Sequence, residues 1–359
     1  MKHIFFLLLA ILTLTTQAQA LAVPEELERA LPEAAEDILE LETLTDANAL
    51  SGGLMQIWES LCENAEELWR KQTAGAARIL LAAVLCGAVE AVQPEKHSKT
   101  TLFLPMAGAL AITGLTVGSL DSLMGLGRET IRQLADFSEI LLPLLAVATA
   151  AAGGVQSATL QQLAAVFFVE LLIQMIEQLL MPVLLLYVGL LTAACCLEES
   201  RLQLLAEGLR KLIAWALCAV MFLFTGYLSA ARIFTGPADA AAIRLTKATL
   251  SGAVPVVGGI LSEAAEAVLA GAGVLRGSVG LIGLLSVLAV CGYPFLRLGI
   301  QYLLYKLTAC LSSLLETPEL SWLIDGLGSA FGLILGMTGS CALLLLLSVI
   351  SCISAVVSS

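Results

Sequence analysis

Long runs of apolar residues, separated by short polar segments, dominate the chain from residue 76 onward. An α-helix needs about 20 consecutive, predominantly apolar residues to cross a bilayer. Runs close to this length predict membrane-spanning helices in the uncharged region that follows Asp325 and at residues 76–93, 101–120, 137–154, 212–234 and 279–296.

One apolar run, at residues 163–197, is too long for a single crossing. Gln174, Glu177, Gln178 and Pro182 interrupt this run and predict a break between two helices. The sequence therefore predicts an all-α, polytopic membrane protein with about seven or eight transmembrane helices.

Two segments between these runs are amphipathic. Residues 121–136 mix charged residues with leucines, which is typical of a helix that lies in the membrane interface. The segment after residue 296 holds Arg297, Tyr302, Tyr305 and Lys306 and follows the span at 279–296 as another amphipathic piece. We expect the first of these segments to separate two spans.

The first 20 residues have the pattern of a secretory signal peptide. Lys2 supplies a positive charge, residues 4–14 form an apolar stretch, and Ala18-Gln19-Ala20 is a small-x-small cleavage site. The apolar stretch is short for a membrane span, so we expect cleavage after Ala20. The alternative is that the segment is retained as a first transmembrane helix.

An acidic segment follows the predicted cleavage site. Between residues 21 and 70, thirteen acidic residues oppose two arginines. Cytoplasmic flanks of spans favour Lys and Arg, so this segment is expected outside the cytoplasm. Its amphipathic helical pattern predicts either a small exported cap or a docking surface for a partner. The expected organisation is a signal peptide (1–20), an extracytoplasmic helical segment (21–75) and a membrane domain (76–359).

Composition and charge narrow the class of protein further. Hydrophobic residues make up 58% of the chain and charged residues 13%, whereas a soluble domain has about a quarter charged residues. The net charge of −12 argues against a nucleic-acid partner and leaves membrane lipids as the expected surroundings. The chain has two histidines, His3 and His97, and we find no catalytic or metal-binding motif. We therefore expect neither enzymatic activity nor a cofactor.

The stretch at residues 251–277 is apolar but interrupted. Pro255, Gly258 and Gly259 disfavour a continuous helix, and a short helix that carries Glu263 and Glu266 on one face is expected to follow. This pattern predicts a broken or re-entrant segment. Such a backbone survives at membrane depth only when it packs within protein or lines water, so the segment is either a conduit element or a packed one.

Two carboxylates lie within the long apolar run. Glu170 and Glu177 are seven residues apart and so share one helical face. Carboxylates inside a membrane are costly and often functional, so the pair is a candidate cation or proton site of a transporter. Alternatively, Glu177 lies at the interface and Glu170 pairs with a polar neighbour, which is the interpretation we favour.

Glycines recur every fourth residue near the C-terminus. Gly328, Gly332 and Gly336 form a smooth ridge on one face of a helix, which lets a second helix approach closely. Gly114 and Gly118 repeat the pattern once. The ridge predicts helix packing, with a partner helix either in this chain or in another one.

Two stretches of the sequence resemble a known family. FSEILLPLLAVATAAAGGVQSATLQQ, at 137–162, and PVVGGILSEAAEAVLAGAGVLRGSVGLIGLL, at 255–285, are similar to signatures of the stage III sporulation protein AE family. Pro294 and then Tyr305-Lys306 continue the likeness, which is best between residues 102 and 315. PVVGGILSEA is the most specific part, because its Pro, Gly and acid pattern is not general membrane composition.

The resemblance implies a role in endospore formation. It implies a membrane subunit of the transenvelope channel between mother cell and forespore, in the mother-cell membrane that surrounds the forespore. Its partners would be the other stage III sporulation A proteins and, through them, stage II sporulation protein Q. The family brings no established catalytic residues. The alternative is a secondary transporter or permease that acts alone.

Overall fold

The computed structural model describes residues 32, 35, 49–92, 99–197, 199–253, 258–314 and 318–354. Regular structure within this part of the chain is helical, without strands. The elements, in chain order, are α4 (Ala49–Val92), α5 (Lys99–Ala151), α6 (Val155–Met175), the π-helical turn η2 (Ile176–Leu180), α7 (Met181–Leu197), α8 (Ser200–Ala253), α9 (Gly258–Ser313) and α10 (Pro318–Ser354).

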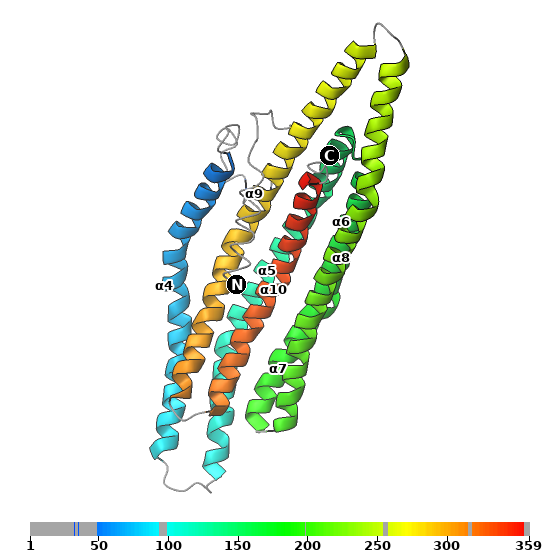
Figure 1. Ribbon diagram of the computed structural model, residues 1–359. Coiled ribbons are helices and arrows are strands. Elements are labelled where there is room, and N and C mark those ends of the chain that lie inside the picture. Colours follow the sequence, from blue (N-terminus) through cyan, green and yellow to red (C-terminus); the bar gives the residue numbers. More distant parts are fainter. Residues whose placement is uncertain are drawn as a thin grey trace.

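The helices lie side by side in an elongated bundle and run up and down along a common axis (Figure 1). α10 lies inside the bundle, where it contacts every helix from α5 to α9. In an apolar 18-residue window of α9 and of α10, 67% and 61% of the residues are buried, against 17% in the corresponding window of α4. The absence of charge after Asp325 follows from this position, because a helix that other helices surround has no face left for charged residues.

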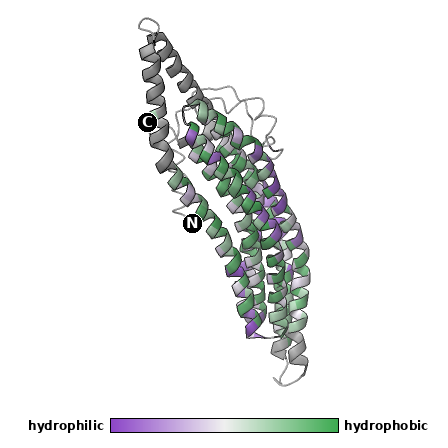
Figure 2. Ribbon diagram, turned by 90° about the vertical axis from the view of Figure 1, so that its right-hand side faces the viewer, coloured by the Kyte–Doolittle hydropathy of each residue, from purple (hydrophilic) through white to green (hydrophobic). Residues whose placement is uncertain are grey.

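Six helical stretches in the described residues are long and apolar enough to cross a bilayer, and apolar residues lie along most of the bundle (Figure 2). They are Gly52–Val89, Met106–Ala151, Ala158–Leu197, Ser200–Ala231, Gly277–Ser313 and Pro318–Ile353. The described part of the chain is therefore all-helical and has the helices of a membrane protein. It holds six such stretches, so the count of seven or eight is not confirmed, because two pairs of predicted spans are each joined into one continuous helical rod.

The first join lies in α5, which runs without a break through the segment predicted to lie at the interface. Leu123, Ile131 and Leu134 are buried on one face of residues 121–136, whereas Arg128 is exposed on the other. The helix and its two faces match the prediction. The interfacial placement was wrong, because α10 and other helices of the bundle cover the apolar face in place of lipid.

The second join lies between α6 and α7. The break predicted between Gln174 and Pro182 is instead the π-helical turn η2, with helical dihedral angles on both sides at Met175 and Met181. A π-helical turn adds a residue to a helix without ending it. The chain therefore keeps its direction from Ala158 to Leu197.

The chain reverses direction between α5 and α6 within three residues. Gly153 has a φ of 94°, a conformation in which a side chain is strained. Its amide donates to the carbonyl of Ala150 at 2.9 Å, and the amide of Gly154 donates to the carbonyl of Thr149 at 3.0 Å. The glycine pair in the 137–162 stretch thus forms a tight helical hairpin.

Two expected boundaries fall inside helices. α4 runs through residue 76, where the membrane domain was expected to begin. α8 continues past residue 237 to Ala253, although the sequence predicted its end at residue 234. The predicted signal peptide, residues 1–20, lies outside the described residues.

Candidate functional site

The residues of the interrupted stretch are distributed around the junction of α8 and α9. α8 ends at Ala253 and α9 begins at Gly258, while Pro255 lies outside the described residues. Gly259 lies in the first turn of α9. The expectation of a short, separate helix was wrong, because α9 continues to Ser313 as one helix.

Glu263 and Glu266 lie near the start of α9, and their side chains are outside the described part. The structure thus places the backbone of this candidate conduit element at one end of the bundle, where α8 and α9 extend past the other helices (Figure 1).

Glu170 and Glu177 lie on the outside of the bundle, each with its own polar partner. Gln174 Nε2 donates to Glu170 Oε1 at 2.6 Å, one helical turn away. Glu177 lies in η2 and pairs with Arg132 of α5, with 3.3 Å between Oε1 and Nε. Since the two carboxylates have separate partners, they do not form one enclosed cation site.

The glycine ridge of α10 packs against neighbouring helices of the same chain. A Cβ atom on Gly328 would lie 2.9 Å from the Cβ of Tyr305, and one on Gly332 would lie 3.0 Å from the Tyr302 ring. Gly336 faces Leu217 of α8, at 3.8 Å. The first two glycines therefore allow α9 and α10 to approach closely.

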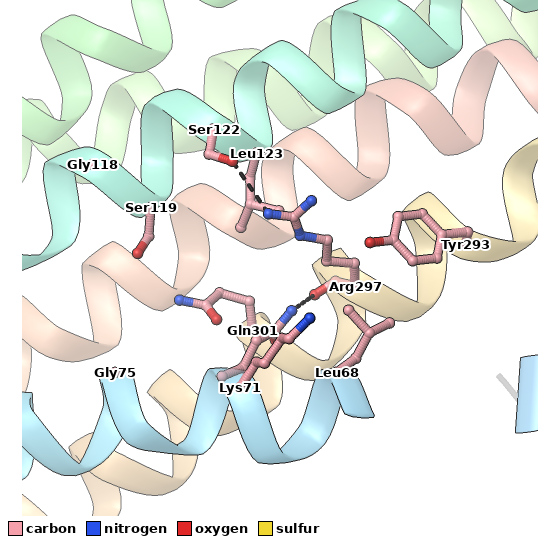
Figure 3. Close-up of a pocket in the computed structure, with 11 residues that line it drawn as sticks. Leu68, Lys71, Gly75, Gly118, Ser119, Ser122, Leu123, Tyr293, Arg297 and Gln301 are labelled. Atoms are coloured by element: carbon pink, nitrogen blue, oxygen red, sulfur yellow. Dashed lines mark hydrogen bonds between the residues drawn. The ribbon is translucent and has the colours of Figure 1, made fainter. Parts of the chain in front are cut away.

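A polar cavity of about 450 Å³ lies between α4, α5 and α9 (Figure 3). Eleven residues line it, and among these described residues two are cations and none carries a carboxylate. The cations are Lys71 and Arg297. This is unusual in a chain with 30 acidic and 18 basic residues. The polar lining residues used below are Lys71 and Gln72 from α4, Ser119 and Ser122 from α5, and Arg297 and Gln301 from α9.

Arg297 is at the centre of this cavity. Its Nη2 donates to Ser122 Oγ at 3.2 Å, and its backbone carbonyl accepts a hydrogen bond from Gln72 Nε2 at 3.2 Å. Among the described residues, no carboxylate forms an ion pair with Arg297. Lys71, by contrast, pairs with Glu67 one turn earlier in α4, at 2.6 Å. Arg297 is therefore the uncompensated charge of the site.

Polar contacts continue along α9 beyond the cavity. The hydroxyl of Tyr305, which is buried, donates to Thr116 Oγ1 of α5 at 3.1 Å. Lys306 Nζ pairs with Asp325 Oδ1 of α10 at 2.6 Å and donates to Ser329 Oγ at 3.0 Å. These contacts tie α9 to α5 on one side and to α10 on the other.

One sequence pattern points to this site, but the prediction of the spans did not take it into account. Tyr293, Arg297, Gln301 and Tyr305 are spaced by four residues and so lie on one face of α9. The first three line the cavity and the fourth reaches α5. A polar stripe of this kind inside a long apolar helix indicates a buried polar site, but it does not show which helices supply the facing walls.

Comparison with known proteins identifies the family. The family model described as "Stage III sporulation protein AE" matches residues 42–356, which include the whole described bundle up to Ser354. The stage III sporulation protein AE of Bacillus subtilis (strain 168) is 24% identical over 197 residues, which are 55% of this chain.

The match spans about half of that relative, 49% of its length. The names of the family and of the relative give a stage of sporulation and no enzymatic activity. No solved structure matches the chain. With a family match over most of its length, the chain belongs to the stage III sporulation protein AE family.

Proposed function

We propose that the protein is a membrane subunit of the transenvelope channel between mother cell and forespore, the stage III sporulation A complex. The observation that carries this proposal is the family match over residues 42–356. It agrees with the bundle, which has six apolar helices long enough to span a membrane among the described residues. Family membership supports a role in sporulation, and the apolar helices support a position in a membrane.

The interior of the bundle favours a platform role over a pore within one chain. Apart from the polar cavity between α4, α5 and α9, a large hydrophobic core fills the space between the helices, with Phe137, Phe224, Tyr305 and Phe331 among its largest fully buried side chains. A close-packed core of this kind leaves no continuous path for water. A passage would therefore be formed between several chains, and this subunit would supply part of its wall or its anchor in the membrane.

The proposed partners are the other stage III sporulation A proteins and, through them, stage II sporulation protein Q. The proposed location is the mother-cell membrane that surrounds the forespore. The N-terminal half of α4 carries Glu59, Glu63, Glu66 and Glu67, and α4 has the least buried apolar window of the six, which makes this acidic half the first surface to test for partner contacts.

Deletion of the gene in the native organism tests the role. We expect the count of heat-resistant spores to fall by several orders of magnitude and to recover when the wild-type gene is supplied elsewhere on the chromosome. Spore formation at the wild-type level in the deletion strain would contradict the proposal. Copurification from sporulating cells tests the partners separately.

The alternative of a transporter that acts alone gains no support from Glu170 and Glu177, because each has a separate polar partner at the outer face. Purified protein in liposomes distinguishes the two functions. Solute uptake with no partner present would favour the transporter. Normal sporulation in the deletion strain together with such uptake would replace the channel proposal.

A further inference from the structure

We propose that the cavity between α4, α5 and α9 binds a phosphate group, supplied by the headgroup of an anionic phospholipid. The proposal does not depend on the channel role. It begins with Arg297, which lies in the apolar stretch Gly277–Ser313 of α9. Arg297 directly follows the span predicted at 279–296, where a lipid headgroup would lie, and it has no carboxylate partner among the described residues. A ligand that carries negative charge would supply the missing partner.

The donors around Arg297 fit a phosphate group. A guanidinium has five N–H donors in a planar fork that binds phosphate oxygens in pairs, and Ser122 accepts one hydrogen bond from Arg297. Ser119 and Gln301 line the same space and can donate to further oxygens. Lys71, already paired with Glu67, lies at the α4 wall of the cavity. The lining thus has several donors and one unpaired positive charge.

Gln72 ties α4 to α9 beside the guanidinium. Its Nε2 donates to the Arg297 carbonyl at 3.2 Å, while its Oε1 is buried and out of reach of a ligand. The charge of the headgroup therefore decides the choice of lipid. Phosphatidylglycerol brings a negative phosphate alone, whereas phosphatidylcholine would also place a cation beside Arg297 and Lys71.

The shape of the cavity also suits a headgroup. Gly75 on α4 and Gly118 on α5 line it, and a Cβ atom added to either would meet nothing within 4 Å. The volume of about 450 Å³ lies in the range typical of small-ligand sites, about 300–1,000 Å³. Leu68, Leu123 and Tyr293 add apolar lining for the glycerol backbone and the start of the acyl chains.

Native mass spectrometry of the full-length protein tests the proposal. The probes are phosphatidylglycerol, phosphatidylcholine and inorganic phosphate, each added to delipidated protein in detergent. We expect bound phosphatidylglycerol in excess of phosphatidylcholine. Arg297→Gln should lower the affinity for phosphatidylglycerol at least about tenfold, because it removes a charge-assisted, bidentate contact. Lys211→Gln, which removes an exposed cation of α8 far along the sequence from the cavity residues, should leave the affinity unchanged.

A second variant keeps the test valid if Arg297→Gln does not fold. Gly118→Leu fills the cavity and leaves Arg297 in place, so it should also abolish the preference for phosphatidylglycerol. Gly114→Leu, one turn earlier on α5 with equally open surroundings and outside the cavity, is the matched control and should retain it.

The outcomes separate the two sources of phosphate. If inorganic phosphate binds in an Arg297-dependent way and phosphatidylglycerol shows no preference over phosphatidylcholine, the lipid assignment is wrong. If neither phosphate source depends on Arg297 or on Gly118, the cavity is not a phosphate site.

Discussion

The close approach of α9 and α10 at Gly328 can be tested by adding a single methyl group. In Gly328→Ala the new Cβ would lie 2.9 Å from the Cβ of Tyr305. Carbon atoms prefer a separation of about 3.5–4.0 Å, so the backbones must move apart by about 0.6 Å or more. Tyr305 is unable to yield easily, because its hydroxyl is bonded to Thr116 and its ring packs edge-on against Phe331 with centroids 4.9 Å apart.

The cost of this movement can be isolated with a matched control. Overpacking a well-packed core costs about 1–3 kcal/mol. Replacing a helical glycine by alanine returns about 1 kcal/mol through helix propensity. Gly114→Ala on α5 gains the same propensity without a clash, since nothing lies within 4 Å of its added Cβ. The unfolding free energy of Gly328→Ala should therefore lie about 1–3 kcal/mol below that of Gly114→Ala.

A thiol-reactive fluorescent maleimide measures the difference in detergent-solubilised protein. Cys291 and Cys341 are buried and become reactive only on unfolding, so the midpoint of the fluorescence rise reports Tm. The shift in Tm per kcal/mol falls with chain length and is about 2–4 °C for domains of 150–250 residues, so in this longer chain Gly328→Ala should melt at least about 1 °C below Gly114→Ala. A midpoint equal to or above that of the control would refute the close contact between α9 and α10 at this position.

Three further predictions follow from the described contacts. Gly153→Ala should lower the unfolding free energy by about 1–2 kcal/mol, because φ is 94° there, and the same maleimide assay checks it. Lys306→Met and Asp325→Asn should show a coupling of only about 0.5–1 kcal/mol in a double-mutant cycle, because solvent screens side chains that are 28% and 47% exposed. The double variant Glu170→Gln, Glu177→Gln should sporulate normally in a spore count; a defect at wild-type protein level would favour a proton-coupled role.

The glycine ridge and the helix junction could be predicted from the sequence because both depend on local chemistry. Small residues at every fourth position make a smooth helical face whatever covers it, and Gly328 and Gly332 do meet another helix. Pro255 and the following glycines disfavour a helix, and α8 and α9 end and begin on either side of residues 254–257. The length of the helix that follows was not predictable from these breakers.

The interfacial placement of residues 121–136 failed for a different reason. An amphipathic pattern shows that one face of a helix is apolar, but lipid and another helix cover such a face equally well. In α5 the cover is protein: a Cβ on Gly127 would lie 3.0 Å from the Ile334 side chain of α10. Similarly, Gln72 and Arg297 are 225 residues apart in sequence. The cavity between their helices depends on tertiary packing and could not be predicted from a local sequence pattern.

The length of α9 determines how far the bundle extends beyond the hydrocarbon core of the membrane. At 1.5 Å per residue, its 56 residues extend about 84 Å, while the hydrocarbon core of a bilayer is about 30 Å thick. Even at a tilt of about 40°, the core takes up only about 39 Å of helix. About 45 Å of the rod therefore stands clear of the hydrocarbon, divided between the two sides. A partner that binds the far end of α8 and α9 would therefore be held tens of ångströms from the hydrocarbon, at a distance set by the length of these two helices.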